Sequence, residues 1–366
     1  MAIKQFLSLS LCLLTGIASA MAQHRADPQK LDDPKSFTFV VFGDPQGYNK
    51  YDINQPLFEL STVWIADNVK TLHIRAVLFT GDLVEQNENS VPRPTMLNQT
   101  SKQQWEWASH CLKRLDNKVV YMSAAGNHEY GYVRGDEDFT HFGEYITAER
   151  NSLNAEHLVA AFPNRRGQQT LENAAWEFNE EHWGKLLVIS SEWAPRDEAL
   201  AWALNLCKSE KYRQHKVIYL THSLLMNRTA GYTDNESYKI TPRNYGKGIW
   251  DKLLSQAPNI VLAVCGHTGE PAKEAGSKED FENNTAYRCD KNQSGRSVHQ
   301  MMFNIQCLGG GWEGNGGDGW LRLLEFMPDG KTIKAKTYSP LFGISPMTRH
   351  LAHRTEPCCQ FEMVID

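Results

Sequence analysis

Six polar residues, each close behind an apolar run, carry side chains of the kinds that bind divalent metals in proteins. They are carboxylates, side-chain amides and imidazoles: Asp44, Gln46, Asp82, Asn127, His222 and His267. This mixture of oxygen and nitrogen donors suits an ion such as Mn²⁺, Fe²⁺, Zn²⁺ or Co²⁺. A single aspartate or histidine behind a strand is usually structural, whereas a regular series of them predicts a metal site.

The runs before these residues have the composition of buried β-strands. We expect strands at 37–42, 76–80, 119–124, 217–220 and 260–264, and helices at 56–71, 102–115 and 195–207. Strands that alternate with helices indicate an α/β fold. Ligands of such sheets bind beyond the carboxyl ends of the strands, so the six side chains are expected to converge at one edge.

The rest of the chain predicts further elements around this core. Residues 175–179 and 185–190 are expected to form a hairpin, 130–172 a loop-rich insertion near the site, and 301–308, 320–326 and 332–338 an antiparallel meander. The glycine-rich stretch 309–319 matches G-x-G-x-x-G, but a strand-like run follows it. A dinucleotide fingerprint needs a helix there, so we interpret the stretch as a loop.

Five motifs in this order resemble those of calcineurin-like metallophosphoesterases, whose secreted bacterial members the segment from about 285 to 355 also resembles. The five motifs are Gly43-Asp44-Pro45-Gln46, Gly81-Asp82-Leu83-Val84-Glu85, Gly126-Asn127-His128-Glu129, Thr221-His222 and Gly266-His267-Thr268-Gly269. The resemblance implies a four-layer α-β-β-α sandwich with two mixed sheets. It also implies a metal site at the C-terminal ends of the strands.

The resemblance implies roles for the individual residues. Asp82 would bridge two metals, and Asn127, His222 and His267 would complete one of the two sites. The other site would use Asp44 and Asp82 with two histidines.

The chain departs from the family pattern at both of those histidines. Gln46 stands in place of one and Gly269 in place of the other, and Glu270 is the neighbouring residue that could fill the gap. The expectation is therefore one or two divalent ions per chain.

The catalytic pair implied by the resemblance is His128 with Glu85. A carboxylate beside an imidazole raises the imidazole pKa and fixes its tautomer, which suits a proton donor. The expected reaction is attack of a metal-bound hydroxide on phosphorus, with His128 protonating the leaving oxygen. A phosphomonoester or a phosphodiester is the expected substrate.

The N-terminus has the layout of a secretory signal peptide. Lys4 precedes the apolar run 6–17, and small residues follow it up to Ala22. We expect cleavage after Ala20 or Ala22, a secreted or periplasmic protein, and no transmembrane segment in the mature chain. The predicted parts are a signal peptide at 1–22, an N-terminal arm at 23–36, one catalytic domain at 37–345 and a tail at 346–366 that can add a strand.

Composition limits the function further. The formal net charge is -5, so the sequence has no basic footprint for nucleic acid. The alternative to an enzyme is a non-catalytic or regulatory binding protein on the same fold with a degraded metal centre, which the changes at Gln46 and Gly269 would suit. A metal-dependent hydrolase of another bond is a third interpretation that no residue favours.

Overall fold

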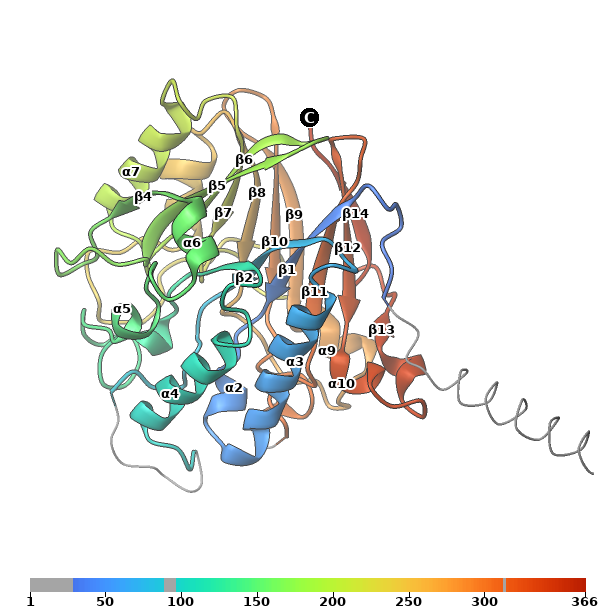
Figure 1. Ribbon diagram of the computed structural model, residues 1–366. Coiled ribbons are helices and arrows are strands. Elements are labelled where there is room, and N and C mark those ends of the chain that lie inside the picture. Colours follow the sequence, from blue (N-terminus) through green and yellow to red (C-terminus); the bar gives the residue numbers. More distant parts are fainter. Residues whose placement is uncertain (1–28, 89–96, 312–313) are drawn as a thin grey trace, which may run out of the picture.

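Two seven-stranded β-sheets face each other in the computed structural model, which describes residues 29–88, 97–311 and 314–366 (Figure 1). The predicted signal peptide and the first residues of the N-terminal arm lie outside the described residues. No helix within the described ranges is long and apolar enough to cross a membrane.

The first sheet runs in the order β13-β12-β11-β1-β2-β3, with β14 also paired to β12. Its strands are β1 (Phe37–Phe42), β2 (Ile74–Phe79), β3 (Val120–Ser123), β11 (Leu321–Phe326), β12 (Thr332–Tyr338), β13 (His353–Arg354) and β14 (Phe361–Val364). Strands β1, β2 and β3 are parallel, whereas β11 lies antiparallel to β1.

The second sheet runs in the order β4-β5-β6-β7-β8-β10-β9. Its strands are β4 (Leu158–Phe162), β5 (Asn173–Glu180), β6 (Gly184–Ser190), β7 (Lys216–Leu220), β8 (Ile260–Cys265), β9 (Thr285–Lys291) and β10 (Ser297–Phe303). Strands β6, β7, β8 and β10 are parallel, and β4, β5 and β9 complete the sheet with antiparallel pairs. Both sheets are therefore mixed.

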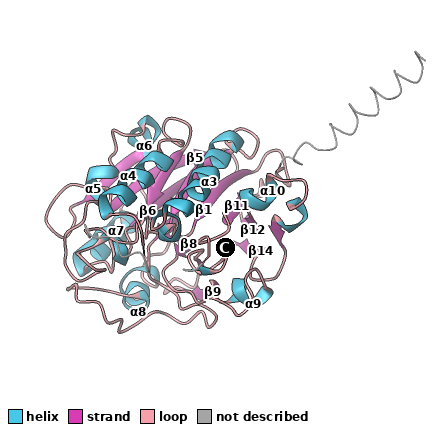
Figure 2. Ribbon diagram, turned by 90° about the horizontal axis from the view of Figure 1, so that it is seen from below, coloured by secondary structure: helices cyan, strands magenta, loops and turns pink. Residues whose placement is uncertain are grey.

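Helices cover the outer face of each sheet (Figure 2). The longer ones are α3 (Gln55–Asn68), α4 (Ser101–Leu112) and α7 (Asp197–Lys208), and the shorter ones are α2 (Gln46–Asn49), η1 (Asp52–Asn54), η2 (Asn127–Glu129), α5 (Phe142–Tyr145), α6 (Ser152–His157), α8 (Gly246–Ile249), η3 (Trp250–Leu254), α9 (Lys278–Glu282), α10 (Pro340–Gly343) and η5 (Arg349–Leu351). Thr100 caps α4, because its side chain accepts a hydrogen bond from the backbone N–H of Gln103.

Side chains of the central strands alternate between two packing layers. In β1, Phe39 packs on Phe178 of the second sheet, whereas Phe42 packs on Phe58 of α3. In β6, Leu186 joins the core between the sheets and Leu187 joins the core beneath α7. Strands that are buried on both faces read as continuous apolar runs, which is why they could be found in the sequence. The predicted α/β fold with two mixed sheets flanked by helices is confirmed.

The predicted antiparallel meander near the C-terminus is wrong. β11 and β12 are antiparallel neighbours, but β10 lies in the other sheet, parallel to β8 and beside β9. An apolar run fixes that a segment is a buried strand but not which sheet it joins. Residues 130–172 include α5, α6 and β4 in addition to loops, and residues 346–366 contribute β13 and β14.

Candidate metal centre

Loops behind five strands bring the candidate residues to one end of both sheets. Asp44, Asp82 and Asn127 follow β1, β2 and β3 of the first sheet. His222 and His267 follow β7 and β8 of the second sheet. All five side chains are buried or nearly so. The cluster thus lies where the carboxyl ends of parallel strands from the two sheets meet.

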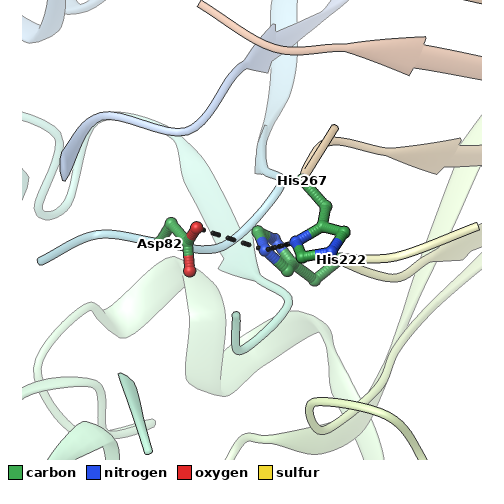
Figure 3. Close-up of side chains that lie close together, drawn as sticks. All are labelled: Asp82, His222 and His267. Atoms are coloured by element: carbon green, nitrogen blue, oxygen red, sulfur yellow. Dashed lines mark hydrogen bonds and ion pairs between the residues drawn. The ribbon is translucent and has the colours of Figure 1, made fainter. Parts of the chain in front are cut away.

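His222 lies between Asp82 and His267 (Figure 3), and Asn127 completes a group of four donor side chains around it. The His222 Nε2 atom is 3.2 Å from Asp82 Oδ2, 3.1 Å from Asn127 Oδ1 and 3.1 Å from His267 Nδ1. One donor atom each of Asp82, His222 and His267 lies within 4.8 Å of the others. Two atoms that bind one ion at about 2.1 Å lie roughly 3 to 3.4 Å apart, so the donor set fits a single divalent ion.

Hydrogen bonds on the far side of each imidazole orient its metal-facing nitrogen. His222 Nδ1 lies 2.8 Å from the Thr80 carbonyl oxygen, and His267 Nε2 lies 2.6 Å from Glu236 Oε2. In the neutral imidazole that binds a metal, a ring nitrogen that donates its proton to such a partner leaves the other nitrogen with a free lone pair. His222 Nε2 and His267 Nδ1 are therefore prepared as ligand atoms.

Glu129 holds the two loops that carry Asp82 and Asn127. Its carboxylate accepts hydrogen bonds from the backbone N–H groups of Asp82, Val84 and Gly126. Asp82 itself has a φ of 51° and accepts from the backbone N–H of His128. This left-handed backbone is costly for an aspartate and persists only because the surrounding loops hold it.

Electrostatics at the centre favour a cation. Burial works to raise the pKa of Asp82, but the charges of His222 and His128 outweigh it and hold that pKa below its usual value. Burial works to lower the pKa of His222, yet the Asp82 and Asp44 carboxylates raise it to about 10. The imidazole thus takes up positive charge that a bound divalent ion would otherwise supply.

His128 and Glu85 lie together beside the cluster. His128 Nδ1 is 2.6 Å from the Glu85 backbone oxygen and 3.6 Å from its carboxylate Oε2, and His128 Nε2 is 4.0 Å from Asp82 Oδ2. Burial works to lower the His128 pKa, but Asp82 and Glu85 raise it overall. Burial raises the pKa of Glu85. The backbone oxygen, more than the carboxylate, fixes the ring.

Two of the residues predicted for a second ion, Gln46 and Asp44, contact members of the four-donor group, whereas Glu270 lies away from it. Gln46 directs its amide nitrogen at Asp82 Oδ2, at 3.0 Å. Asp44 accepts hydrogen bonds from the Thr80 hydroxyl, at 2.5 Å, and from the His267 backbone, at 2.7 Å. Glu270 is largely exposed, with its carboxylate 3.9 Å from Arg228. The Gln46 Oε1 atom is buried without a hydrogen-bond partner among the described residues.

A cavity of about 480 Å³ opens beside the cluster. Its lining includes Glu236, the partner of His267, together with Tyr238, Arg134 and Lys239. The Tyr238 ring packs on the His267 ring with centroids 6.0 Å apart. Arg134 lies close enough to act electrostatically on Glu85 and His128. The cavity thus offers cations and an aromatic wall next to the candidate catalytic groups.

Sequence reasoning missed three residues that organise the centre. Glu129 stands in the third motif, so its place beside His128 was a usable signal. Glu236 lies in a polar loop after β7, and Gln306 lies in a loop after β10. Glu236 follows no apolar run, so no local pattern marks it, whereas Gln306 follows the apolar end of β10 by three residues but lies within the run 301–308 that the sequence predicts to be a strand.

Comparisons with known proteins agree with the motif order. The family model of calcineurin-like phosphoesterases matches residues 37–271. The "Uncharacterized protein YvnB" of Bacillus subtilis (strain 168) is 27% identical over 306 residues, which cover 83% of this chain and 20% of that protein. The chain therefore spans about a fifth of the length of this curated relative.

Three solved structures align with most of the chain at low identity. GAP50, the anchor in the inner membrane complex of Plasmodium, has a TM-score of 0.40 and 11% identity over 90% of this chain and 89% of that chain. A 5'-nucleotidase precursor from Thermus thermophilus has a TM-score of 0.42 and 14% identity, and the match covers 82% of this chain and 54% of that chain. The NAD nucleotidase NadN of Haemophilus influenzae has a TM-score of 0.39 and 13% identity, and the match covers 90% of this chain and 56% of that chain.

Proposed function

Because the chain belongs to the calcineurin-like phosphoesterase family, we propose that it is a secreted, metal-dependent enzyme that hydrolyses a phosphomonoester or a phosphodiester. The observation that carries this proposal is the convergence of Asp82, Asn127 and His267 on His222, at distances expected around one ion. A divalent ion bound there would attract phosphate oxygens and would lower the pKa of a water molecule.

The chain's own residues supply the remaining chemistry. His128 lies at the edge of the donor group, with Nδ1 held by the Glu85 backbone oxygen, so its Nε2–H is free to protonate a leaving oxygen. The raised pKa of His128, which results from Asp82 and Glu85 prevailing over burial, favours the protonated acid that this role requires. A binding protein would have no use for such an acid.

The neighbouring cavity supports binding of the substrate beyond the reacting phosphate. Arg134 and Lys239 can attract an anionic ester, and Tyr238 offers an apolar ring to its organic part. The carboxylates in the lining are already engaged, since Glu236 bonds His267 and Asp136 accepts from the backbone of Tyr132. Hydrogen bonding leaves these carboxylates charged, so the lining presents two cations beside two anions, and Arg134 and Lys239 are the groups that can bind a phosphate oxygen directly.

Export is the second part of the proposal, and it is supported by the layout of residues 1–22. Expression of the full chain in a Gram-negative host, followed by mass spectrometry of the periplasmic and cytoplasmic fractions, tests it. We expect the periplasmic form to begin after Ala20 or Ala22. A full-length cytoplasmic product alone would contradict export.

The activity is tested with the purified mature protein. We expect it to bind Mn²⁺ or Zn²⁺ and to hydrolyse p-nitrophenyl phosphate or bis-p-nitrophenyl phosphate, with activity lost on chelation and restored by metal. Metal binding without turnover on these esters or on a panel of natural phosphoesters would instead favour the regulatory binding protein. Absence of bound metal would contradict both.

A further inference from the structure

We propose that the centre holds one divalent ion per chain, and that a group of side-chain amides fills the place at which the motif pattern predicts a second ion. The group consists of Gln46, Gln306, Asn304 and Asn284. This inference rests on the proposed metal centre, but it concerns how many ions that centre holds and which residues exclude another. It does not depend on which ester is hydrolysed.

Gln46 acts on Asp82 as a hydrogen-bond donor and not as a metal ligand. Its Nε2 atom lies 3.0 Å from Asp82 Oδ2 and 2.5 Å from Gln306 Oε1. Both partners are acceptors, so the amide must present its NH₂ group to them. The Gln46 Oε1 atom is buried without a hydrogen-bond partner, but it is the other branch of the amide and does not face Asp82 Oδ2.

Gln306 is fixed in the orientation that Gln46 requires. Its Nε2 atom donates to the His267 backbone oxygen at 3.2 Å, which leaves Oε1 to accept from Gln46. Its backbone N–H donates to Asn304 Oδ1 at 2.9 Å. Because both ends of the Gln306 amide are used, a reversal of the Gln46 amide would place two acceptor oxygens against each other.

The second family histidine is excluded by Asn284. A Cβ atom at Gly269 would overlap Asn284 Oδ1. Asn284 is fully buried, and its Nδ2 atom donates to the backbone oxygens of Glu270 and Asp280 at 3.0 and 2.7 Å. The side of the centre that a histidine at position 269 would occupy is therefore filled by an anchored amide.

Glu270 does not replace the missing histidine. Its side chain is 63% exposed and lies against Arg228 at the surface. A second ion would then have only Asp44 and a share of Asp82 as anionic ligands. A dication stripped of water needs a full set of good donors, and neutral amide oxygens are weaker ligands than the two imidazoles they would replace. The NH₂ group of Gln46 instead donates a hydrogen bond to Asp82 Oδ2 and adds no charge to the site.

The direct test counts ions in the intact mature protein. The protein is loaded with Mn²⁺, freed of excess metal and examined by elemental analysis and by electron paramagnetic resonance. We expect about one Mn²⁺ per chain and the spectrum of an isolated ion. Two ions per chain, or the spectrum of an exchange-coupled pair, would overturn the inference, and so would the absence of any bound ion.

Variants test whether the amides are what exclude the second ion. Gln46→His alone is expected to keep one ion, because the Gly269 side stays closed by Asn284. The triple variant Gln46→His, Gly269→His, Asn284→Ala restores both imidazoles and removes the overlap, so its metal content is expected to double. Circular dichroism checks that both variants fold. A folded triple variant that still binds one ion would refute the role given to the amides.

The same samples separate this inference from the proposed function. One ion per chain without hydrolysis of any ester would contradict the function and leave the inference standing. Two ions per chain with hydrolysis would contradict the inference and support the proposed function. One ion with hydrolysis supports both.

Discussion

At the residue scale, the centre depends most on His222, since its Nε2 atom faces a carboxylate, an amide oxygen and a second imidazole. We expect His222→Ala to weaken Mn²⁺ or Zn²⁺ binding by at least about 100-fold and to abolish hydrolysis. Competition with a fluorescent chelator measures the affinity. His110→Ala, on the surface of α4, is the control and should bind metal normally.

Glu236 is expected to act through His267, as a positioning residue. Removing its carboxylate frees the His267 ring, so Glu236→Ala should weaken metal binding by about 10- to 100-fold. Glu236→Gln should recover part of the affinity, because an amide oxygen can still accept the ring proton. The control is Glu270→Ala, which changes an exposed glutamate outside the cluster. Equal affinities in the two alanine variants would contradict this role.

The role of His128 can be tested by how strongly the effect of its substitution on kcat depends on the leaving group of the ester. A general acid matters most when the departing oxygen is strongly basic, so His128→Ala should slow hydrolysis of phenyl phosphate by about 100- to 10,000-fold. The loss should be much smaller with p-nitrophenyl phosphate, whose leaving group needs little protonation. A comparison of kcat values tests this. Equal losses on both esters would indicate a structural role for the imidazole.

At the element scale, the loops behind the strands place the ligands through close backbone contact. Gly126, directly before Asn127, lies so near to Asp82 that an added Cβ would overlap Asp82 Oδ1. Glu129 accepts hydrogen bonds from the backbone of both loops and thereby ties them to each other. Such contacts allow little adjustment, because the loops are anchored on buried strands of one sheet.

We therefore expect Gly126→Ala to displace Asp82 and to weaken metal binding without unfolding the sheets. Its matched control is Gly231→Ala, since a Cβ there meets only Thr229 Oγ1 at an ordinary 3.6 Å. Calorimetric titration with Zn²⁺ compares the two variants. Normal Zn²⁺ affinity in Gly126→Ala would show that the loop can shift. The close approach of Gly126 to Asp82 would then not be needed to hold the ligand in place.

At the scale of the whole molecule, the proposed ion would join the two sheets. Asp82 and Asn127 follow strands of the first sheet, whereas His222 and His267 follow strands of the second. Between them lies a core of interleaved aromatic and aliphatic side chains, such as the Phe39–Phe178 contact. A ligand that binds only the folded arrangement stabilises the entire protein.

Metal binding should thus raise the melting temperature. At a free metal concentration of 100 times Kd, the gain in the free energy of unfolding is about 2.7 kcal/mol. Differential scanning calorimetry with Zn²⁺ and then with a chelator measures the shift. The His222→Ala variant should show none, and a similar rise in that variant would place the stabilising ion elsewhere.

The sequence alone determined which segments are central strands and which residues follow them. Buried strands of parallel pairs read as continuous apolar runs, so β1, β2, β3, β7 and β8 could be located to within a few residues. The polar groups behind those runs then marked Asp44, Asp82, Asn127, His222 and His267, because parallel strands present their carboxyl ends at a common edge. These inferences need only local patterns and their order.

Only the tertiary structure decided how segments distant in the sequence meet. In the structure β10 pairs with β8 and is not part of the expected meander, and Glu236 hydrogen-bonds to His267. The fold also places Gln306 against Gln46 and Asn284 in the space beside Gly269. Each of these contacts joins segments that are separate in the sequence. A local pattern carries no record of such partners, because they are selected by the packing of the whole chain.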